Sequence, residues 1–375
     1  MRAIMTTITA GAAVALVAGC TASPTTRPAP EQPPTSAAPT SGVEPSGEVT
    51  EVATGLAAPW SVVALDDSTA LVSERDSAAI QHVGADGALA EVGVIDGVVP
   101  GGEGGLLGLA THDDASGDTW LYAYFTAADD NRIVRMPLDT SSGASPSLGS
   151  PEVVLEGLDK ARTHNGGRIA FGPDDLLYVT TGDAGEPSRS QDPESLSGKI
   201  LRLTPEGEAA DGNPTDGSPV YSMGHRNPQG IAWDDDGQLW AAEFGQNTWD
   251  EFNRIEPGAN YGWPEVEGIV EDERFVDPVA QWTTDESSPS GLGYVDGTFF
   301  LAALRGERLW AISPDGDAAA ASTDFLTGDY GRLRDAVAAP DGGLWVLTNN
   351  TDGRGSPTEG DDRLLHVELT PVPEG

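Results

Sequence analysis

The sequence predicts an all-β fold, a six-bladed β-propeller, from three observations. An apolar stretch, an acidic or Asp-Gly turn and a second apolar stretch recur six times along the chain. The first Asp of each turn stands at position 66, 113, 174, 234, 296 or 341, which gives spacings of 47, 61, 60, 62 and 45 residues. β-Branched and aromatic residues flank the turns, and long helical periodicity is absent from the sequence. Short strands repeated at this period are typical of a propeller rather than a sandwich.

The first 19 residues predict export. Arg2 precedes an apolar run from Ala10 to Ala18, which is too short to span a bilayer comfortably. Small residues lead to Cys20, the sole cysteine, and fit a lipoprotein signal in which Cys20 is lipidated and becomes the mature N-terminus. We therefore expect residues 1–19 to be a signal peptide and the lipid to anchor the protein to the outer face of the cytoplasmic membrane. The alternative is a free or buried thiol.

Residues 20–48 are rich in Pro, Thr, Ser and Ala and contain almost no large apolar side chains. Such a segment cannot bury a core, so we expect a solvated linker. Residues 49–371 are then expected to form one propeller domain, since all-β propellers of this length can fold as one unit. Because the lone cysteine is assigned to the lipid, packing rather than disulfides must hold the domain together.

The chain is strongly acidic, with a formal charge of −40 at pH 7 and lysine only at positions 160 and 199. This charge repels phosphate backbones and anionic lipid headgroups. We therefore expect no nucleic-acid partner and no membrane contact beyond the lipid on Cys20. Solubility explains most surface carboxylates, whereas a cluster of arginines would need a specific function.

Length beyond a minimal blade of ~45 residues falls in connections rich in Gly, Pro and Asp, such as 183–198 and 205–220. We expect these loops to build a site at one mouth of the propeller. The repeat alone fits a binding or scaffold propeller equally well, because a fold does not set function.

Three segments carry a resemblance to a known family: 163–185 (THNGGRIAFGPDDLLYVTTGDAG), 221–268 (which begins YSMGHRNPQGIAW) and 330–350 (YGRLRDAVAAPDGGLWVLTNN). In these segments the chain closely resembles the glucose/sorbosone dehydrogenases, and the resemblance extends from about Val52 to Leu369. It implies an enzyme that carries pyrroloquinoline quinone (PQQ) and calcium on a six-bladed propeller and oxidises the C1 hydroxyl of an aldose sugar to a lactone. The sequence contains no Cys-x-x-Cys-His haem site, so the electron acceptor would be a separate molecule.

His164 is the candidate general base. Histidine suits this role at neutral pH because its unperturbed pKa lies near ~6.5. A lone histidine before a strand is more often structural, but the resemblance implies that His164 takes the proton of the anomeric hydroxyl. Thr163 stands where some relatives have an acidic residue that orients the base, so the partner of His164 is open. His225, which adjoins Arg226, is the next candidate.

PQQ carries three carboxylates and an ortho-quinone, so its pocket must supply positive charge, and arginine pairs with carboxylates in bidentate fashion. Arg332 and Arg334 are two residues apart, which places both on one face of an extended segment. The resemblance implies that the cofactor is bound by Arg226, Asn227, Arg305, Arg332 and Arg334. It also implies a catalytic role for Arg226, which would stabilise charge on the quinone oxygen. A surface salt bridge is the alternative for each arginine alone.

Glu103 stands where some relatives have a glutamine that contacts the cofactor. A carboxylate that faces a polyanionic cofactor must be protonated, paired with arginine or turned away. We assign Glu103 to the pocket and leave these three states open.

Oxygen ligands in the 245–251 region suit calcium. The resemblance implies that the backbone carbonyls of Gly245 and Gln246 hold a catalytic calcium. It assigns a second, structural calcium region to Asp250, Glu251, Tyr261 (through its carbonyl) and Glu271. Ordinary solvated acids are the alternative for Asp250 and Glu251.

Tryptophans divide into two groups. Trp282 is a candidate stacking wall for a sugar, as in the family, and core packing is the alternative. Trp240, Trp310 and Trp345 lie within strand patterns and are expected in the blade core.

Two other functions remain open from the sequence. One is a calcium-dependent lactonase or esterase propeller, in which acidic and amide side chains would cage the metal and the arginines would have no task. The other is a non-catalytic carbohydrate-binding propeller, which the unusual residues Glu103 and Thr163 favour. The sequence does not determine which sugar is used, what the natural acceptor is, or whether the chain forms a homodimer.

Overall fold

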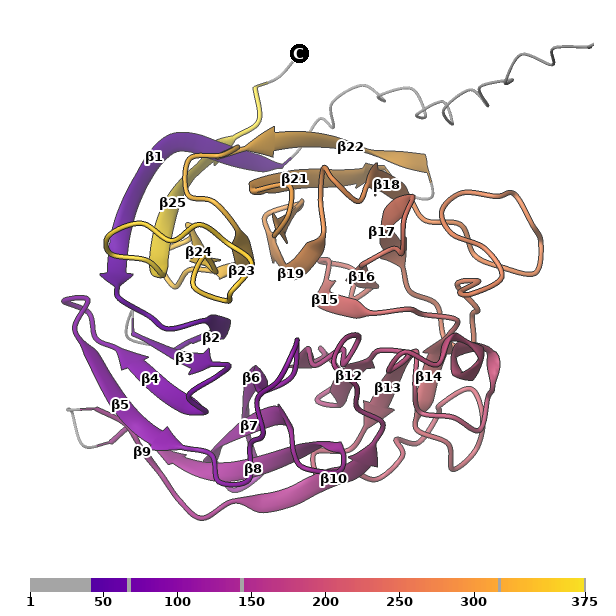
Figure 1. The fold of residues 1–375 in the computed structure, drawn as a ribbon, viewed down its shortest axis with the longest axis horizontal. Helices are drawn as coiled ribbons and strands as arrows, with labels where there is room; N and C mark the ends of the chain where they lie inside the picture. Colours follow the sequence, from indigo (N-terminus) through magenta and orange to yellow (C-terminus); the bar gives the residue numbers. More distant parts are fainter. Residues whose placement is uncertain (1–41, 66–68, 142–144, 316–317, 374–375) are drawn as a thin grey trace, which may run out of the picture. The chain divides into compact units, whose positions relative to one another are not determined.

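Six antiparallel sheets surround a common centre in the computed structural model, which describes residues 42–65, 69–141, 145–315 and 318–373 (Figure 1). This arrangement confirms the predicted six-bladed propeller. Each innermost strand contacts the innermost strand of the next blade, and the last of them contacts the first, which closes the ring. The innermost strands are β2 (Pro59–Ala64), β6 (Leu106–Asp113), β11 (Ile169–Phe171), β15 (Pro228–Trp233), β19 (Pro289–Val295) and β23 (Leu333–Ala338).

The other strands follow outward within each blade. Behind β2 lie β3 (Ala70–Glu74), β4 (Ala79–Val83) and β5 (Leu89–Val94); behind β6 lie β7 (Thr119–Thr126), β8 (Asn131–Asp139) and β10 (Glu152–Leu158), with β9 (Ser147–Leu148) paired to β8. Behind β11 lie β12 (Leu177–Thr181), β13 (Lys199–Leu203) and β14 (Val220–Met223); behind β15 lie β16 (Leu239–Glu243), β17 (Trp249–Arg254) and β18 (Ala280–Thr283). Behind β19 lie β20 (Thr298–Ala303), β21 (Arg308–Asp315) and β22 (Ala318–Phe325).

The sixth blade joins the two ends of the described chain. It contains β23, β24 (Leu344–Thr348), β25 (Arg363–Pro371) and, outermost, β1 (Val43–Thr54). β1 therefore begins within the segment expected to be linker, because residues from Val43 onward pair with β25 in an antiparallel ladder. Cys20 and the expected signal peptide lie outside the described residues, so export and the lipid anchor stay predictions.

The recurring acidic turns join the innermost strand of each blade to the second strand, as the repeat predicts; the first of them, at Asp66, lies outside the described residues. The Asp side chains stabilise these turns. Asp114 accepts hydrogen bonds from the amides of Ser116 and Asp118, and its second oxygen accepts one from Trp120 Nε1 at 3.0 Å. Asp234 repeats this pattern with Trp240 Nε1 at 2.9 Å. The turn residue thus also orients an aromatic side chain of the second strand.

Aromatic and aliphatic side chains fill the spaces between neighbouring sheets. Trp240, Trp310 and Trp345 are all buried, so their predicted place in the blade core is confirmed. A 3₁₀ helix, η1 (Pro187–Gln191), lies in the long connection between β12 and β13. Within the described part of the chain, no helix is long and apolar enough to cross a membrane.

Candidate functional site

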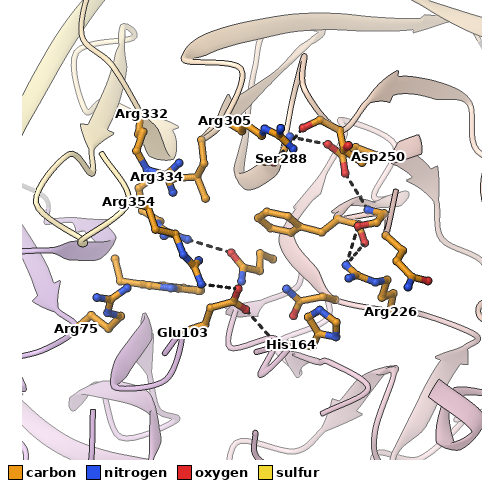
Figure 2. A pocket seen from close by; sticks show the side chains of 18 residues that line it. Arg75, Glu103, His164, Arg226, Asp250, Ser288, Arg305, Arg332, Arg334 and Arg354 are labelled. Atoms are coloured by element: carbon orange, nitrogen blue, oxygen red, sulfur yellow. Dashed lines mark hydrogen bonds and ion pairs between the residues drawn. The ribbon is translucent and has the colours of Figure 1, made fainter. Parts of the chain in front are cut away.

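A cavity of about 420 Å³ opens at the end of the propeller where the innermost strands begin (Figure 2). Its walls come from loops that enter the innermost strands and from loops that leave the second strands. Six of the protein's 20 basic side chains line it: Arg75, Arg226, Arg305, Arg332, Arg334 and Arg354. In a protein with a charge of −40, this is the cluster of arginines that would need a specific function. Sequence reasoning missed Arg75 and Arg354, whose loops belong to none of the three family-like segments.

His164 lines the cavity, and its partner is Asp183. His164 Nδ1 lies 2.7 Å from Asp183 Oδ1, and the second oxygen of Asp183 accepts a hydrogen bond from Trp263 Nε1 at 2.9 Å. Burial favours the protonated acid, but the hydrogen bonds, that to His164 foremost, outweigh it and lower the pKa of Asp183. This answers the question left open by Thr163. The signal was present in the sequence, because Asp183 lies in the same family-like segment, directly after a predicted strand.

His164 has an unusual backbone conformation, with a φ of 59°. Its amide donates to Glu103 Oε2 at 2.9 Å, and its carbonyl accepts from the amide of Ala184 at 3.2 Å. Glu103 therefore lies in the cavity, as expected, and its other oxygen is 3.2 Å from Arg354 Nη2. Of the three states considered for this carboxylate, the structure shows the arginine-paired one.

Arg332 and Arg334 both reach the cavity, and both face the buried carboxylate of Asp352. Arg332 Nη2 lies 3.1 Å and Arg334 Nη2 lies 3.7 Å from Asp352 Oδ2. Burial lowers the pKa of Arg334 to about 9, and the nearby arginines add to this effect while Asp352 opposes it. Two guanidinium groups therefore share one carboxylate, which leaves positive charge on this wall.

Arg226 lies on the opposite side of the cavity (Figure 2), in the loop before β15, and the next residue, Asn227, also lines the cavity. Arg226 Nη1 donates to the carbonyl of Gly245 at 2.7 Å and to that of Phe244 at 3.3 Å. Burial lowers the pKa of Arg226. The buried Asn227 accepts a hydrogen bond from the amide of Gly166 at 3.0 Å, which ties this loop to the loop of His164.

Arg305 is less deeply placed than the other predicted arginines. Its side chain is 61% exposed and pairs with the exposed Asp285 at 2.6 Å. Arg305 thus combines the two interpretations, since it lines the cavity and also forms a surface ion pair.

The expected structural calcium ligands do not lie together. Asp250 lines the main cavity with Gly245 and Gln246, and burial raises its pKa to about 7. The next residue, Glu251, points to the other side of β17 and lines a small neighbouring cavity with Tyr261, which shares Arg226, Phe244 and Gly245 with the main one. Glu271 lines neither cavity; it is exposed and its amide bonds to Asp277. The four residues are thus divided between two neighbouring cavities and an exposed segment, and their binding of calcium stays a prediction.

The small cavity contains two acids that sequence reasoning missed, Glu243 and Glu267. Burial and the nearby charge of Glu243 raise the pKa of Glu251. Across the described ranges, no three acidic, His or Cys side chains are arranged to hold a metal ion.

Trp282 does not line the cavity, which corrects its assignment as a sugar-stacking wall. It is buried in the core of the fourth and fifth blades, where it stacks on Trp310 with ring centroids 5.3 Å apart. The alternation of β18 directs its ring inward. Trp60 lies in the cavity instead, beneath the guanidinium groups of Arg168 at 4.4 Å and Arg334 at 5.8 Å.

Known proteins share this fold over most of the chain. The family model described as glucose/sorbosone dehydrogenase matches residues 56–359. A Streptomyces coelicolor aldose sugar dehydrogenase, solved in its PQQ-bound form, is 54% identical, with a TM-score of 0.84 over 89% of this chain and 100% of that chain. A Thermus thermophilus structure described as a putative oxidoreductase (glucose dehydrogenase) is 41% identical, with a TM-score of 0.77 over 86% of this chain and 99% of that one.

A curated relative matches over a shorter region. Quinoprotein glucose dehydrogenase B of Acinetobacter calcoaceticus is 33% identical over 203 residues, which are 46% of this chain and 42% of that protein. The family match, in contrast, includes the loops that carry Glu103, His164, Arg226 and Arg332. From this match the chain belongs to the glucose/sorbosone dehydrogenase family.

Proposed function

We propose that this protein is a PQQ- and calcium-dependent dehydrogenase that oxidises the C1 hydroxyl of aldose sugars to lactones. The observation that carries the proposal is one cavity in which arginines surround a His–Asp pair. The Streptomyces coelicolor relative, an aldose sugar dehydrogenase solved with PQQ, supports the same function. The separate electron acceptor is part of the proposal.

The chain's own groups fit PQQ. Arg226 Nε and Arg332 Nε are buried and have no hydrogen-bond acceptor, although both residues line the cavity. A buried donor without an acceptor costs about 1–3 kcal/mol, and carboxylates or carbonyls of a bound ligand would remove this cost. Burial also disfavours the charged forms of Arg226 and Arg334, which an anionic ligand would stabilise.

PQQ, when bound, supplies an ortho-quinone that accepts hydride from the substrate. His164 would accept the proton of the C1 hydroxyl. Its Nδ1 is held by the Asp183 carboxylate, so this nitrogen carries the hydrogen and Nε2 has the free lone pair. Asp183 thereby fixes the tautomer and stabilises the ring once it is charged. Arg226 would place a guanidinium beside the oxygen that gains charge.

Calcium would bind at the carbonyls of Gly245 and Gln246, whose residues line the cavity. The Gly245 carbonyl already attracts a cationic group, the guanidinium of Arg226. Asp250 lies close by, since its carboxylate accepts a hydrogen bond from the amide of Gly245 at 2.8 Å. These hard oxygen donors are the type that calcium prefers.

Reconstitution tests the proposal. Purified protein freed of cofactor should reduce a redox dye with aldoses only after PQQ and calcium are both added, and chelation should remove activity and weaken PQQ binding together. A lactone panel assayed in parallel provides the control for a hydrolase. Lactone hydrolysis with calcium alone, or sugar binding without dye reduction under any loading, would overturn the assignment as a dehydrogenase.

A further inference from the structure

We infer that Glu103 and Arg354 act as a positioning pair for the proposed base. Glu103 holds the main chain of His164, and Arg354 neutralises the Glu103 carboxylate so that it can lie beside an anionic cofactor. The inference rests on the proposed function, and it assigns a role to Arg354, which lies outside the family-like segments.

The Glu103 carboxylate connects three loops from different blades. Glu103 itself lies in the tight turn 101–104 between β5 and β6, where the amide of Gly101 and that of Gly104 bond to each other's carbonyls. Gly102 has a φ of 65°, and a Cβ there would lie 2.1 Å from the Arg162 carbonyl oxygen. The turn is therefore seated directly on the loop of His164. Glu103 Oε2 accepts the His164 amide at 2.9 Å, and Oε1 faces Arg354, in the loop between β24 and β25, at 3.2 Å.

His164 needs such support because its φ of 59° lies in a region that non-glycine residues rarely adopt. Such a conformation persists only where surrounding contacts enforce it. Here the amide is held by Glu103, the carbonyl by Ala184 and the ring by Asp183. Without Glu103, the amide would lose its acceptor and His164 as a whole would lose one of its three anchors. Small displacements of a base are costly for proton transfer.

Arg354 connects this support to the charges on the far wall. Its amide donates to Asp352 Oδ1 at 2.8 Å, and the other oxygen of Asp352 pairs with Arg332. Glu103 without Arg354 would present to the cavity a carboxylate that has lost its ion-pair partner and interacts only at longer range with Arg75 and Arg226. A bound polyanion would then be repelled at the point where the base lies.

The alternative is an ordinary surface ion pair, since the Arg354 side chain is 46% exposed. Exposed pairs contribute little, and their removal does not affect distant groups. Arg274, which does not line the cavity, forms exposed pairs with Glu265 at 2.7 Å and Asp272 at 2.8 Å, so Arg274→Gln is the control.

Four variants separate the two interpretations: Glu103→Leu, Glu103→Gln, Arg354→Gln and the double variant Glu103→Gln/Arg354→Gln. Amide hydrogen exchange at His164 is measured in cofactor-free protein. Leucine offers no acceptor, so exchange should accelerate roughly tenfold or more, whereas glutamine keeps an acceptor oxygen and should stay within about threefold of wild type. In the PQQ-loaded enzyme, Glu103→Leu should lower kcat by roughly tenfold with little change in KM.

The charge role is read from PQQ titrations. Arg354→Gln should weaken PQQ binding by roughly tenfold, and adding Glu103→Gln should restore most of that loss, because the carboxylate that lost its ion-pair partner disappears. Arg274→Gln should change neither quantity. Unchanged His164 exchange in Glu103→Leu, or strictly additive effects of the two Gln substitutions, would overturn the inference even if the wild-type enzyme oxidises sugars. A wild-type protein that never binds PQQ would overturn the proposed function, and the exchange result would still decide whether Glu103 holds His164.

Discussion

His164 acquires its proposed role from neighbours that are distant in sequence. An isolated histidine near neutral pH exists as two tautomers and rotates freely, so it is a poor base until its ring is fixed. The buried Asp183 carboxylate fixes the ring, and Trp263 and the amide of Gly185 in turn hold Asp183. The ability of His164 to act as a base therefore depends on these hydrogen-bonded neighbours and not on the imidazole alone.

Changing Asp183 to Asn tests this dependence. Asparagine nearly preserves size but can present its NH₂ to Nδ1, which favours the wrong tautomer, so kcat should fall by roughly 10²-fold or more. His164→Gln should cause a loss of similar size, and the double variant should be little worse than either, since the two residues act as a unit. PQQ titration should be unchanged in all three. A kcat within about threefold of wild type for Asp183→Asn would rule out Asp183 as the partner of the base.

The same substitution has a signed effect on stability. The folded-state pKa of Asp183 lies below its usual value of 3.8, so its contribution is fully present above pH about 4 and is lost as pH falls through the lowered pKa. Wild type and Asp183→Asn should therefore differ most in unfolding free energy at neutral pH and converge in acid. A gap that widens on acidification would contradict the lowered pKa.

The loop between β12 and β13, which carries the His164 partner Asp183, is held without a disulfide. Lys199, fully buried in β13, donates from Nζ to the carbonyls of Arg189, Ser190 and Ser197 at 2.8, 3.0 and 2.8 Å. A lysine ammonium has three donors, and all three are used here. The side chain thus ties the middle of the 183–198 loop, at η1, and its C-terminal end to one point of the sheet.

Replacing Lys199 by Met should lower the free energy of unfolding by about 2–4 kcal/mol, because three carbonyls lose their buried donor. The other lysine, Lys160, bonds to the carbonyls of Ala127 and Ala128 in a more exposed position, so Lys160→Met is the matched control and should cost about 1 kcal/mol or less. Chemical denaturation measures both. Limited proteolysis within 183–198 should accelerate only in the Lys199 variant.

The effect of Lys199 also depends on pH with a defined sign. Burial lowers its pKa from 10.5 to about 8, opposed by Asp192. Between these values the unfolded chain keeps a proton that the folded protein has released, so stability contributed at this site rises with pH, by up to ~1.4 kcal/mol per unit. Between pH 8 and 10, the free energy of unfolding of the wild type should therefore rise relative to that of Lys199→Met. A constant difference across this range would contradict the lowered pKa.

Blade turns and strands were predictable from the sequence because their signals are local. Asp114 and Asp234 lie within six residues of the amides and the indole that they bind, so composition and spacing reveal them. The site depends on contacts across blades instead. Arg354 pairs with Glu103 although the two residues are 251 positions apart in the sequence, and the sequence repeat gives no sign of such a pair. Trp282 was misplaced for a related reason: its residue type suits both a sugar platform and a core, and only the strand's register distinguishes them.

On the scale of the whole molecule, the charge distribution separates surface from site. Acidic residues outnumber basic ones by 60 to 20, yet six arginines gather around one cavity. Like charges spread over the surface keep the protein soluble, and a positive cavity within a negative molecule directs a small anion toward a single place. This pattern suits a protein that must hold an anionic cofactor but repel larger polyanions.

The ring itself is closed by the two ends of the described chain, since β1 and β25 lie side by side in the sixth blade (Figure 1). The ladder extends from the pair Val43–Pro371 to the pair Thr54–Arg363. Val43 and Val49 also pack against the core between the fifth and sixth blades, and Ala53 against that between the sixth and first. The chain passes from β1 in the sixth blade to β2 in the first, and this connection is the covalent link between the two blades. We therefore expect β1 to determine how easily the ring opens.

Two truncations test the closure. A variant that begins at Gly42 retains the whole ladder and should melt within about 2 °C of the full chain, because the hydrogen bonds of the propeller begin there. A variant that begins at Gly55 lacks β1, exposes the edge of β25 and uncovers apolar side chains beneath it, so its Tm should fall by about 10 °C or more. Calorimetry measures the melting temperatures, and light scattering should detect aggregation of the shorter variant alone. Equal melting of both variants would show that blades one to five and β23–β25 hold the ring without β1.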